Sequence, residues 1–419
     1  VVLITTKKGV TDDSKVTINV NSNYSVISNR EYPNYQYAYG SGASGKIAIN
    51  AGSIDPVTGL PFIAFQTRAY GMPFLGQEVV GYNGEPTIYK PNVNNVKELY
   101  RVGSVSTNTI AVSRGNDMGS VRFSFNNTIG DHVMNGMEKQ LRNNFSLRIA
   151  QNLSKKVKTN MTVLYTNLKV ENRMYQNGSE RNPANNYMFM RPDMSQENLF
   201  PYKDLNNNAI VFNGPFTNPY WNLYENSNGD ESNNLVANVS VSWDIIKGLS
   251  LSTKVNGAIN NRQDFQFNNK GAAFDPDGLL IKTNSNRQNW NYEAILNYNK
   301  KFRDFSIVSL AGVNRFDLRF SNQINQVNSL AVRDVISLFN TEDIPIIRDV
   351  ADNKRINSVF GSLSVGYKDT YYLDVTARND WSSALPSGNN SYFYPSVGGS
   401  VLFSDFIPKN KLLNFGKIR

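Results

Sequence analysis

The chain is 419 residues long, has a formal net charge of +9 and contains one histidine and no cysteine. Without cysteine, the sequence holds no disulfide framework, no cysteine-based zinc site and no cysteine nucleophile, and a single histidine leaves most histidine-dependent catalysis without partners. No run approaches the ~20 consecutive apolar residues of a membrane-spanning helix. Charged residues make up only 18%, and uncharged polar residues, above all asparagine, take their place.

A period of two in hydrophobicity is the main structural signal in the sequence. Between Val16 and Val26 apolar residues alternate with threonine, asparagine and serine, and the same pattern returns from Leu235 to Ile245. Such alternation predicts β-strands with one apolar and one polar face. In chain order, twelve strands are expected near residues 16–27, 108–114, 120–130, 141–153, 157–170, 235–246, 249–262, 289–300, 305–318, 356–368, 371–379 and 394–403.

The expected connections alternate between short and long. Tight turns are expected at residues 114–119, 154–156, 247–248, 300–304 and 368–370. Longer loops are expected at residues 131–140, 171–234, 263–288, 319–355 and 380–393. Hydrophobic alternation alone does not separate a soluble β-sandwich from a membrane barrel, but one trimmed end and one loop-bearing end are typical of outer-membrane barrels. The sequence therefore predicts an all-β fold, a transmembrane antiparallel β-barrel.

In such a barrel the apolar side chains of each strand face lipid and the polar ones face the lumen. For the strand at residues 235–246, the expected lipid-facing residues are Val239, Val241 and Trp243. The expected lumen-facing residues are Asn238, Ser240 and Ser242.

Four segments stand out as motifs, in chain order: residues 1–9 (VVLITTKKG), 218–221 (NPYW), 372–383 (YLDVTARNDWSS) and 394–400 (YPSVGGS). Together they resemble motifs of SusC/RagA-type TonB-dependent outer-membrane transporters. In that family a segment similar to residues 1–9 is the last strand of the plug domain. The resemblance covers essentially the whole chain.

The resemblance implies a barrel of 22 strands with a plugged lumen, of which about twelve are covered here. Residues 1–9 would then be the last strand of the plug domain. Residues 10–419 would be the N-terminal half of the barrel, with long extracellular loops. We therefore expect a piece of a longer, multi-pass protein of the outer membrane of a Gram-negative bacterium.

The function implied by the resemblance is TonB-dependent active import of an oligomeric nutrient, either a glycan or a peptide. The implied partners are a SusD-like surface lipoprotein, a TonB complex acting through a region upstream of residue 1, and outer-membrane lipid. No cofactor, metal site or enzymatic activity is expected. The alternative is a β-rich outer-membrane adhesin or structural assembly component that uses the long loops without transport.

Loop aromatic residues are candidate substrate contacts, because their faces stack on sugar rings and on peptide side chains. The candidate substrate-binding residues are Tyr35, Tyr37, Tyr39, Tyr220, Trp221 and Trp381. For the loop tyrosines and the Tyr220–Trp221 pair, the alternative is packing within the loops or in an interfacial aromatic girdle. The motif residues expected to be structural are Arg378, Asp380, Ser382, Ser383 and Pro395.

Three other features have simple explanations. The acidic segments at residues 226–231 and 275–278 offer oxygen ligands, but neither fits a complete calcium loop, and turn chemistry explains both. His132 has no visible cluster of partner residues. Lysines near residues 155 and 300 lie in separate short turns rather than on one basic face, so nucleic-acid binding is not expected.

Overall fold

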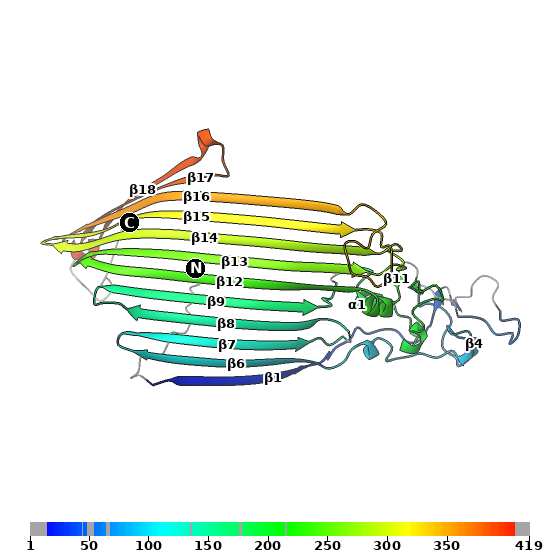
Figure 1. Cartoon of the computed structure of the whole chain (residues 1–419). Coiled ribbons are helices and arrows are strands. Elements are labelled where there is room, and N and C mark those ends of the chain that lie inside the picture. Colours follow the sequence, from blue (N-terminus) through cyan, green and yellow to red (C-terminus); the bar gives the residue numbers. More distant parts are fainter. Residues whose placement is uncertain are drawn as a thin grey trace.

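Twelve long strands form one antiparallel sheet, in which each pairs with the next long strand along the chain (Figure 1). A computed structural model describes residues 15–43, 45–47, 54–63, 68–134, 136–175, 178–213 and 216–406. In sheet order the strands are β1 (Thr17–Ile27), β6 (Gly103–Asn116), β7 (Gly119–Asp131), β8 (Lys139–Asn152), β9 (Val157–Glu171), β12 (Ser227–Ile246), β13 (Leu249–Asn268), β14 (Leu279–Phe302), β15 (Phe305–Val327), β16 (Ile346–Tyr367), β17 (Tyr371–Ser382) and β18 (Ser391–Val401).

Shorter elements lie in the connections. The two-stranded pieces are β2 (Gly42–Ala43) with β3 (Lys46–Ile47), β4 (Glu78–Val80) with β5 (Pro86–Ile88), and β10 (Val211–Asn213) with β11 (Phe216–Thr217). The helices are α1 (Pro183–Met188) and α2 (Pro219–Tyr224), with 3₁₀ turns at Lys97–Leu99, Gln196–Leu199, Ser387–Asn389 and Phe403–Phe406. Each α-helix starts at an asparagine cap followed by proline, the residue best suited to the first helical position. Within the described part of the chain, no helix has the length and apolar character needed to cross a membrane.

The expected strands are confirmed, but five of them extend six or more residues beyond an expected limit. Each extends at the end that carries the long connections. β12 begins at Ser227 instead of residue 235, β13 ends at Asn268 instead of 262, β14 begins at Leu279 instead of 289, β15 ends at Val327 instead of 318, and β16 begins at Ile346 instead of 356. Residues 227–231, predicted to be part of a turn, are therefore strand. The expected plug strand at residues 1–9 lies outside the described residues.

Short and long connections alternate along the sheet as expected. The short ones are residues 117–118, 153–156, 247–248, 303–304 and 368–370. The longer ones are residues 28–102, 132–138, 172–226, 269–278, 328–345 and 383–390. At residues 368–370, Lys368 and Asp369 have φ of 53° and 54°, the left-handed conformation of tight hairpin turns. Because consecutive strands are antiparallel, all short connections lie at one end of the sheet, the left end in Figure 1.

The strand register separates an apolar face from a polar face over the whole sheet. Val239 pairs with Met161 and Val255, which are apolar, and these pairs share a face because cross-strand partners point the same way. One residue further along, Ser240 pairs with Asn160 and Lys254 on the opposite face. We call the face of Val239 the apolar face and the face of Ser240 the polar face.

The sheet curves toward its polar face. In β16, Ser358 on the polar face is 2% exposed, whereas Val359 on the apolar face is 51% exposed. In β15, Gly312 on the polar face is buried and Val313 on the apolar face is 52% exposed. A large, exposed apolar surface on the convex side is the arrangement of a barrel wall that faces lipid and encloses a polar lumen.

A row of amide and hydroxyl side chains bounds the apolar face on the side of the long connections. Its members are successive cross-strand partners from β1 to β15: Ser22, Asn108, Asn127, Asn143, Asn167, Asn233, Asn261, Asn286 and Ser321. Side chains in this outer amide row bond across strands, as in Ser22 to Asn108 at 2.7 Å and Asn127 to Asn143 at 2.8 Å. On β12 and β13 the first residues beyond the row are polar on both faces, with Glu231 and Gln263 on one face and Ser232 and Arg262 on the other. The expected strands end there because the period-two signal ends there.

Aromatic side chains lie at both limits of the apolar face. Next to the outer amide row, Phe145 has ring centroids 4.8 Å from Phe125 and 6.1 Å from Tyr165. Near the short turns, Tyr367 lies 4.9 Å from Phe305 and 6.4 Å from Tyr371. Two aromatic groups separated by an apolar band are the girdles expected at the two membrane interfaces.

Charge placed on the apolar face should be far more costly than the same charge on the polar face. Leu147 and Ser146 are neighbours in β8; Leu147 pairs with Phe123 and Val163, and Ser146 pairs with Ser124 and Leu164. In the full-length protein folded into lipid vesicles, Leu147→Arg should lower the free energy of unfolding by ~2–4 kcal/mol, because arginine then meets hydrocarbon. Ser146→Arg is the control and should cost much less; equal costs would reverse the assignment of the faces.

Candidate substrate-binding site

Three connections, residues 28–102, 132–138 and 172–226, contribute to one apolar cluster at the loop-bearing end of the sheet. The cluster contains Val96, Leu99, Met134, Met137, Tyr187, Met190, Met194, Leu199 and Leu223. Tyr35, Tyr100 and Tyr220 are partly buried against it. The connections at residues 28–102 and 172–226 are therefore a packed layer rather than independent loops, and we call them the loop layer.

Asp193 is the polar centre of the loop layer. Its side chain is buried and accepts hydrogen bonds from the Ser41 backbone N–H at 2.8 Å and from the Tyr82 hydroxyl at 2.7 Å. The guanidinium of Arg191, itself 1% exposed, lies 5.7 Å from the centre of the Tyr82 ring. Burial, followed by the charge of Asp193, raises the pKa of Tyr82, which keeps its hydroxyl protonated and donating.

Side-chain amides that donate to backbone carbonyls form a second set of hydrogen bonds between residues 28–102 and residues 172–226. Asn95 donates to the Arg191 carbonyl at 2.7 Å, and Gln196 donates to the Asn95 carbonyl at 2.6 Å. Asn92 donates through its side chain to the Asp193 carbonyl at 2.9 Å. A side-chain amide that replaces a backbone partner satisfies a polar group that would otherwise be buried unpaired.

A cavity of about 250 Å³ opens in the loop layer and contains two of the predicted aromatic residues. Tyr35 and Tyr37 line it together with Arg68, Tyr70 and Phe189. Partial burial raises the pKa of both Tyr35 and Tyr37, so each presents a neutral hydroxyl. The Tyr37 hydroxyl lies 3.4 Å from Asn95 Oδ1. Aromatic faces beside an arginine can hold a sugar ring or a peptide side chain.

The other predicted aromatic residues lie elsewhere. Tyr39 is exposed and pairs by a backbone bridge with Pro73. Tyr220 is half-buried, with its hydroxyl 2.7 Å from Gln196 Oε1. Trp221 is 0% exposed within α2, so its side chain supports the loop layer instead of lining a cavity. Trp381 lies on the apolar face of β17, opposite Asn357, and thus away from the polar face.

The family-motif residues make contacts within the wall. On the polar face, Arg378 donates from Nε to Asp380 Oδ1 at 2.8 Å and from Nη2 to Ser358 Oγ at 2.9 Å. Ser383 exchanges two bonds with the backbone of residue 355, and the Ser382 N–H donates to the carbonyl of residue 390. Pro395 lies in β18 opposite residue 377.

A second cavity, of about 370 Å³, lies on the polar face of the strand ends beyond the outer amide row. Charged residues of β12, β13 and the segment after β9 line it: Arg173, Asp230, Arg262 and Asp264. Arg173 Nε lies 2.5 Å from Asp230 Oδ1, and Arg262 Nε lies 2.8 Å from Asp264 Oδ1. The Asp230 side chain is 3% exposed and raises the pKa of the Arg173 guanidinium through this bond.

This charged cavity presents positively and negatively charged side chains within one hydrogen-bonded group. The Asp230 Oδ2 atom has no hydrogen-bond partner among the described residues, and both arginines remain about half exposed. The sequence analysis missed the cavity. Arg173 stands in an expected loop and Arg262 at the end of an expected strand, and only the register of the extended strands brings them together.

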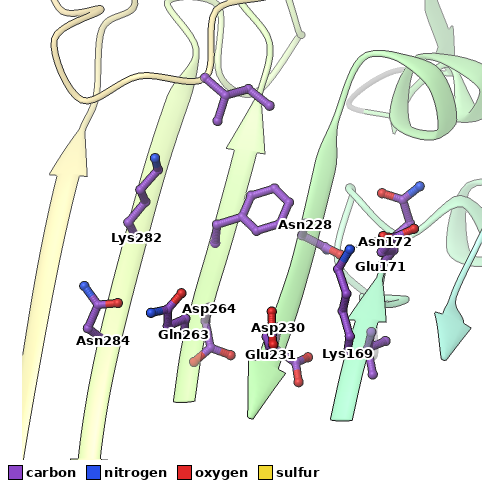
Figure 2. A pocket seen from close by; sticks show the side chains of 13 residues that line it. Lys169, Glu171, Asn172, Asn228, Asp230, Glu231, Gln263, Asp264, Lys282 and Asn284 are labelled. Carbon is purple, nitrogen blue, oxygen red and sulfur yellow. Dashed lines mark hydrogen bonds and ion pairs between the residues drawn. The ribbon is translucent and has the colours of Figure 1, made fainter. Parts of the chain in front are cut away.

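A third cavity, of about 580 Å³, lies at the same strand ends and shares Asn228, Asp230, Asp264 and Phe265 with the charged cavity (Figure 2). Lys169 and Glu171 of β9, Glu231 of β12, Gln263 of β13 and Lys282 of β14 line it. These residues continue the apolar face beyond the outer amide row, where that face has become polar. The third cavity therefore opens to the outside of the curved wall and the charged cavity opens to its inside.

The remaining predictions have local outcomes. The His132 ring Nδ1 accepts a bond from the Met134 N–H at 3.1 Å, which gives it a structural role. At residues 275–278, Gly278 has φ of 80° and donates to the Asp275 carbonyl at 2.9 Å, so this acidic segment is a turn as expected. No group of three or more metal-ligating residues occurs among the described residues.

Removing the Asp193 carboxylate should loosen the loop layer. In the full-length protein, Asp193→Ala leaves the Ser41 N–H and the Tyr82 hydroxyl without their acceptor, at a local cost of about 1 to 3 kcal/mol. We expect faster proteolysis and faster hydrogen exchange in residues 28–102, with the sheet unchanged. Asp343→Ala, at an exposed position in residues 328–345, is the control. Equal protection of residues 28–102 in both variants would remove Asp193 from this role.

No family model matches the sequence. The chain is 22% identical over 282 residues to TonB-dependent receptor P26 of Formosa agariphila, an alignment that covers 64% of this chain and 27% of that protein.

The structural likeness is broader. The RagAB peptide importer in its closed-closed state matches with a TM-score of 0.66 and 16% identity, over 96% of this chain and 46% of that one. Its open-open state matches with a TM-score of 0.64, also at 16% identity, over 96% and 45%. The chain thus spans less than half the length of the relatives it matches. At this identity the likeness establishes the fold, and the wall described above is part of such a barrel.

Proposed function

We propose that this chain, which resembles TonB-dependent receptors in sequence and has the fold of part of their barrel, is the loop-bearing wall of an outer-membrane importer. The observation that carries the proposal is the match of 96% of the chain to the RagAB importer fold. The two-faced sheet supports it independently, because an apolar convex face and a polar concave face suit a wall between lipid and a wet lumen. Import is then active and depends on TonB.

The orientation follows from the connections. In outer-membrane barrels the short turns are periplasmic and the long loops extracellular. We therefore place residues 117–118 and 303–304 in the periplasm of a Gram-negative bacterium. The loop layer and residues 328–345 lie outside the cell.

Oligopeptide is the substrate class that the charged cavity favours. A peptide carries an ammonium group at one end and a carboxylate at the other, and charge-assisted bonds to carboxylate and guanidinium groups are the stronger ones. Asp230 and Arg262 offer both kinds on the lumen side. The RagAB structures are described as those of a peptide transporter, which agrees with this choice.

An oligosaccharide is the second candidate. Tyr35 and Tyr37 support it, because aromatic faces that line a cavity stack on sugar rings and need no charge on the substrate. Either substrate is expected to pass from the loop layer into the lumen.

The proposed partners are a SusD-like surface lipoprotein over the loop layer and a TonB complex on the periplasmic side. Both follow from the family resemblance and from the orientation above. The alternative function, an adhesin that binds through its loops without transport, predicts binding that does not depend on the proton gradient.

Removing one charge from the lumen-side cavity should weaken peptide uptake. In cells carrying the full-length protein, Arg262→Gln should raise the half-saturating concentration of a labelled oligopeptide about tenfold, since a bond to a charged group contributes about 1.5 kcal/mol or more. Lys282→Gln is the control, since it removes a positive charge from the outer side of the same strand ends, where Lys282 pairs with Phe265, three residues beyond Arg262. Dissipating the proton gradient should stop uptake in both.

The outcomes separate the candidate functions. If both variants take up the peptide like the parent while a labelled oligosaccharide is imported, the charged cavity is not a peptide site. Surface binding that survives loss of the gradient, with no accumulation inside, would favour the adhesin.

Epitope tags test the orientation. A tag inserted after Asp343 should be labelled by antibody on intact cells, and a tag inserted after Asp117 should be labelled only after the outer membrane is opened. The reverse pattern would invert the barrel.

A further inference from the structure

A compact group of arginines lies on the apolar face of β15 and β16, in the rows between the outer amide row and the first valine row. The register of β14, β15, β16 and β17 sets out three successive rows there. The upper row pairs Trp290, Asp317 and Arg355; the middle row Tyr292, Arg315, Asn357 and Trp381; the lower row Ala294, Val313, Val359 and Asn379. The face thus changes from arginine to valine within a single step along β15 and within two along β16.

Asp317 holds the two arginines side by side. Its Oδ2 lies 2.7 Å from Arg315 Nε, and its Oδ1 lies 2.6 Å from Arg355 Nε. The Asp317 side chain is 14% exposed, whereas those of Arg315 and Arg355 are 46% and 48% exposed. The carboxylate therefore lies beneath two guanidinium groups that face outward, each with further N–H donors.

The net charge of this patch is positive. Arg319 stands on the same face one row above Asp317, beside Asn353, so three arginines and one carboxylate occupy three adjacent rows. Lys354, next to Arg355 in sequence, belongs to the polar face. Lys254 and Glu293, which pair with each other, also belong to the polar face by register, but they contribute one charge of each sign to the lining of the hollow described next. We call Arg315, Asp317, Arg319 and Arg355 the outer arginine patch.

A hollow of about 380 Å³ opens directly below the outer arginine patch. Arg315 and Asn357 line it on the polar side, Val313 and Val359 form its apolar floor, and Trp381 and Tyr292 stand at its flanks. Trp381 and Tyr292 are 39% and 41% exposed, as expected for aromatic side chains at a membrane interface. The groove thus begins with charged and hydrogen-bonding groups and continues over an apolar floor, with an aromatic side chain on each side.

We propose that the outer arginine patch and the hollow below it bind a phosphate-bearing lipid from the membrane around the barrel. The phosphate bonds to the outward guanidinium groups of Arg315 and Arg355, with Arg319 adding charge. The acyl chain lies over Val313 and Val359, between Trp381 and Tyr292. Each planar guanidinium group can donate two N–H bonds to the oxygens of one phosphate. The guanidinium groups lie above the apolar floor of the groove, in the same order as a lipid headgroup and its hydrocarbon chain.

The geometry favours a lipid over a free anion. A small anion would need only the guanidinium groups, whereas the hollow continues from them across exposed apolar side chains that hydrocarbon covers. The proposal depends on the lipid-facing direction of this wall and not on TonB-dependent import, so it stands or falls separately from the proposed function. It also gives Trp381 a place at the lipid interface instead of in the lumen.

The test uses full-length protein purified in a neutral detergent and stripped of lipid. Three probes are added separately: phosphatidic acid, diacylglycerol with the same chains, and inorganic phosphate. Native mass spectrometry then counts bound molecules. We expect phosphatidic acid to bind at least tenfold more tightly than either of the other probes, because only it has both the phosphate and the chains.

Variants locate the site. Arg355→Gln and Arg315→Gln should each weaken binding of phosphatidic acid about tenfold, the loss of one charge-assisted bond. Lys354→Gln is the matched control, since it removes the same charge from the adjacent residue on the opposite face, and should change binding less than twofold. Arg355→Lys keeps the charge and should give an intermediate loss. Heat-modifiable electrophoretic mobility checks that each variant is folded.

Three results would overturn the proposal. Equal losses in Lys354→Gln and Arg355→Gln would mean that general surface charge attracts the lipid. Diacylglycerol binding as tightly as phosphatidic acid would reduce the site to an apolar groove. Inorganic phosphate that binds as tightly and displaces the lipid would make it a free-anion site.

Discussion

The constraint on which the whole structure depends is that a chain crossing hydrocarbon has no water to bond its backbone N–H and C=O groups. An antiparallel sheet meets this constraint by bonding each strand to its neighbours, and twelve strands of this chain do so in one continuous register. Strand pairing then fixes the face on which each residue's cross-strand partners lie. Once Val239 faces lipid, its cross-strand partners Met161 and Val255 must face lipid too, and Ser240, Asn160 and Lys254 must face the lumen.

The period-two pattern predicts the strands where one face meets lipid and the other meets polar groups. It does not predict them where both faces meet water. Within the apolar band, β12 and β13 have lipid on one face and polar groups on the other, and their expected and observed limits agree at the short turn between Ile246 and Leu249. Beyond the outer amide row water lies on both faces, so asparagine, glutamate and glutamine occupy both. Residues 227–234 therefore carry no alternation, although they are paired as regularly as the rest of β12.

The candidate sites were less predictable, because their contacts join residues that are distant in sequence. Tyr82 and Asp193 are 111 residues apart, and nothing in the local sequence of either one identifies the other. Composition identified Tyr35 and Tyr37 as aromatic residues in a loop, and both do line a cavity, but the same reasoning could not distinguish them from Trp221, which is fully buried. Arg173 and Arg262 meet Asp230 only because β12 and β13 continue past the expected limits.

The extension of the strands beyond the membrane band gives the wall three chemically distinct zones, each with its own use for charge. In the apolar band a charge on the outer face is costly, and the sheet places its arginines, such as Arg148, on the polar face. At the boundary, Arg315 and Arg355 stand on the outer face, where a carboxylate and a phosphate-bearing headgroup can both compensate them. Above the boundary, charged side chains occur on both faces. The face of the sheet decides whether such a side chain points to the inside of the curved wall, as Arg262 does, or to its outside, as Lys282 does. The same side-chain type thus meets hydrocarbon, water or a compensating carboxylate according to its row and face, so strand register decides the surroundings of each charge along this wall.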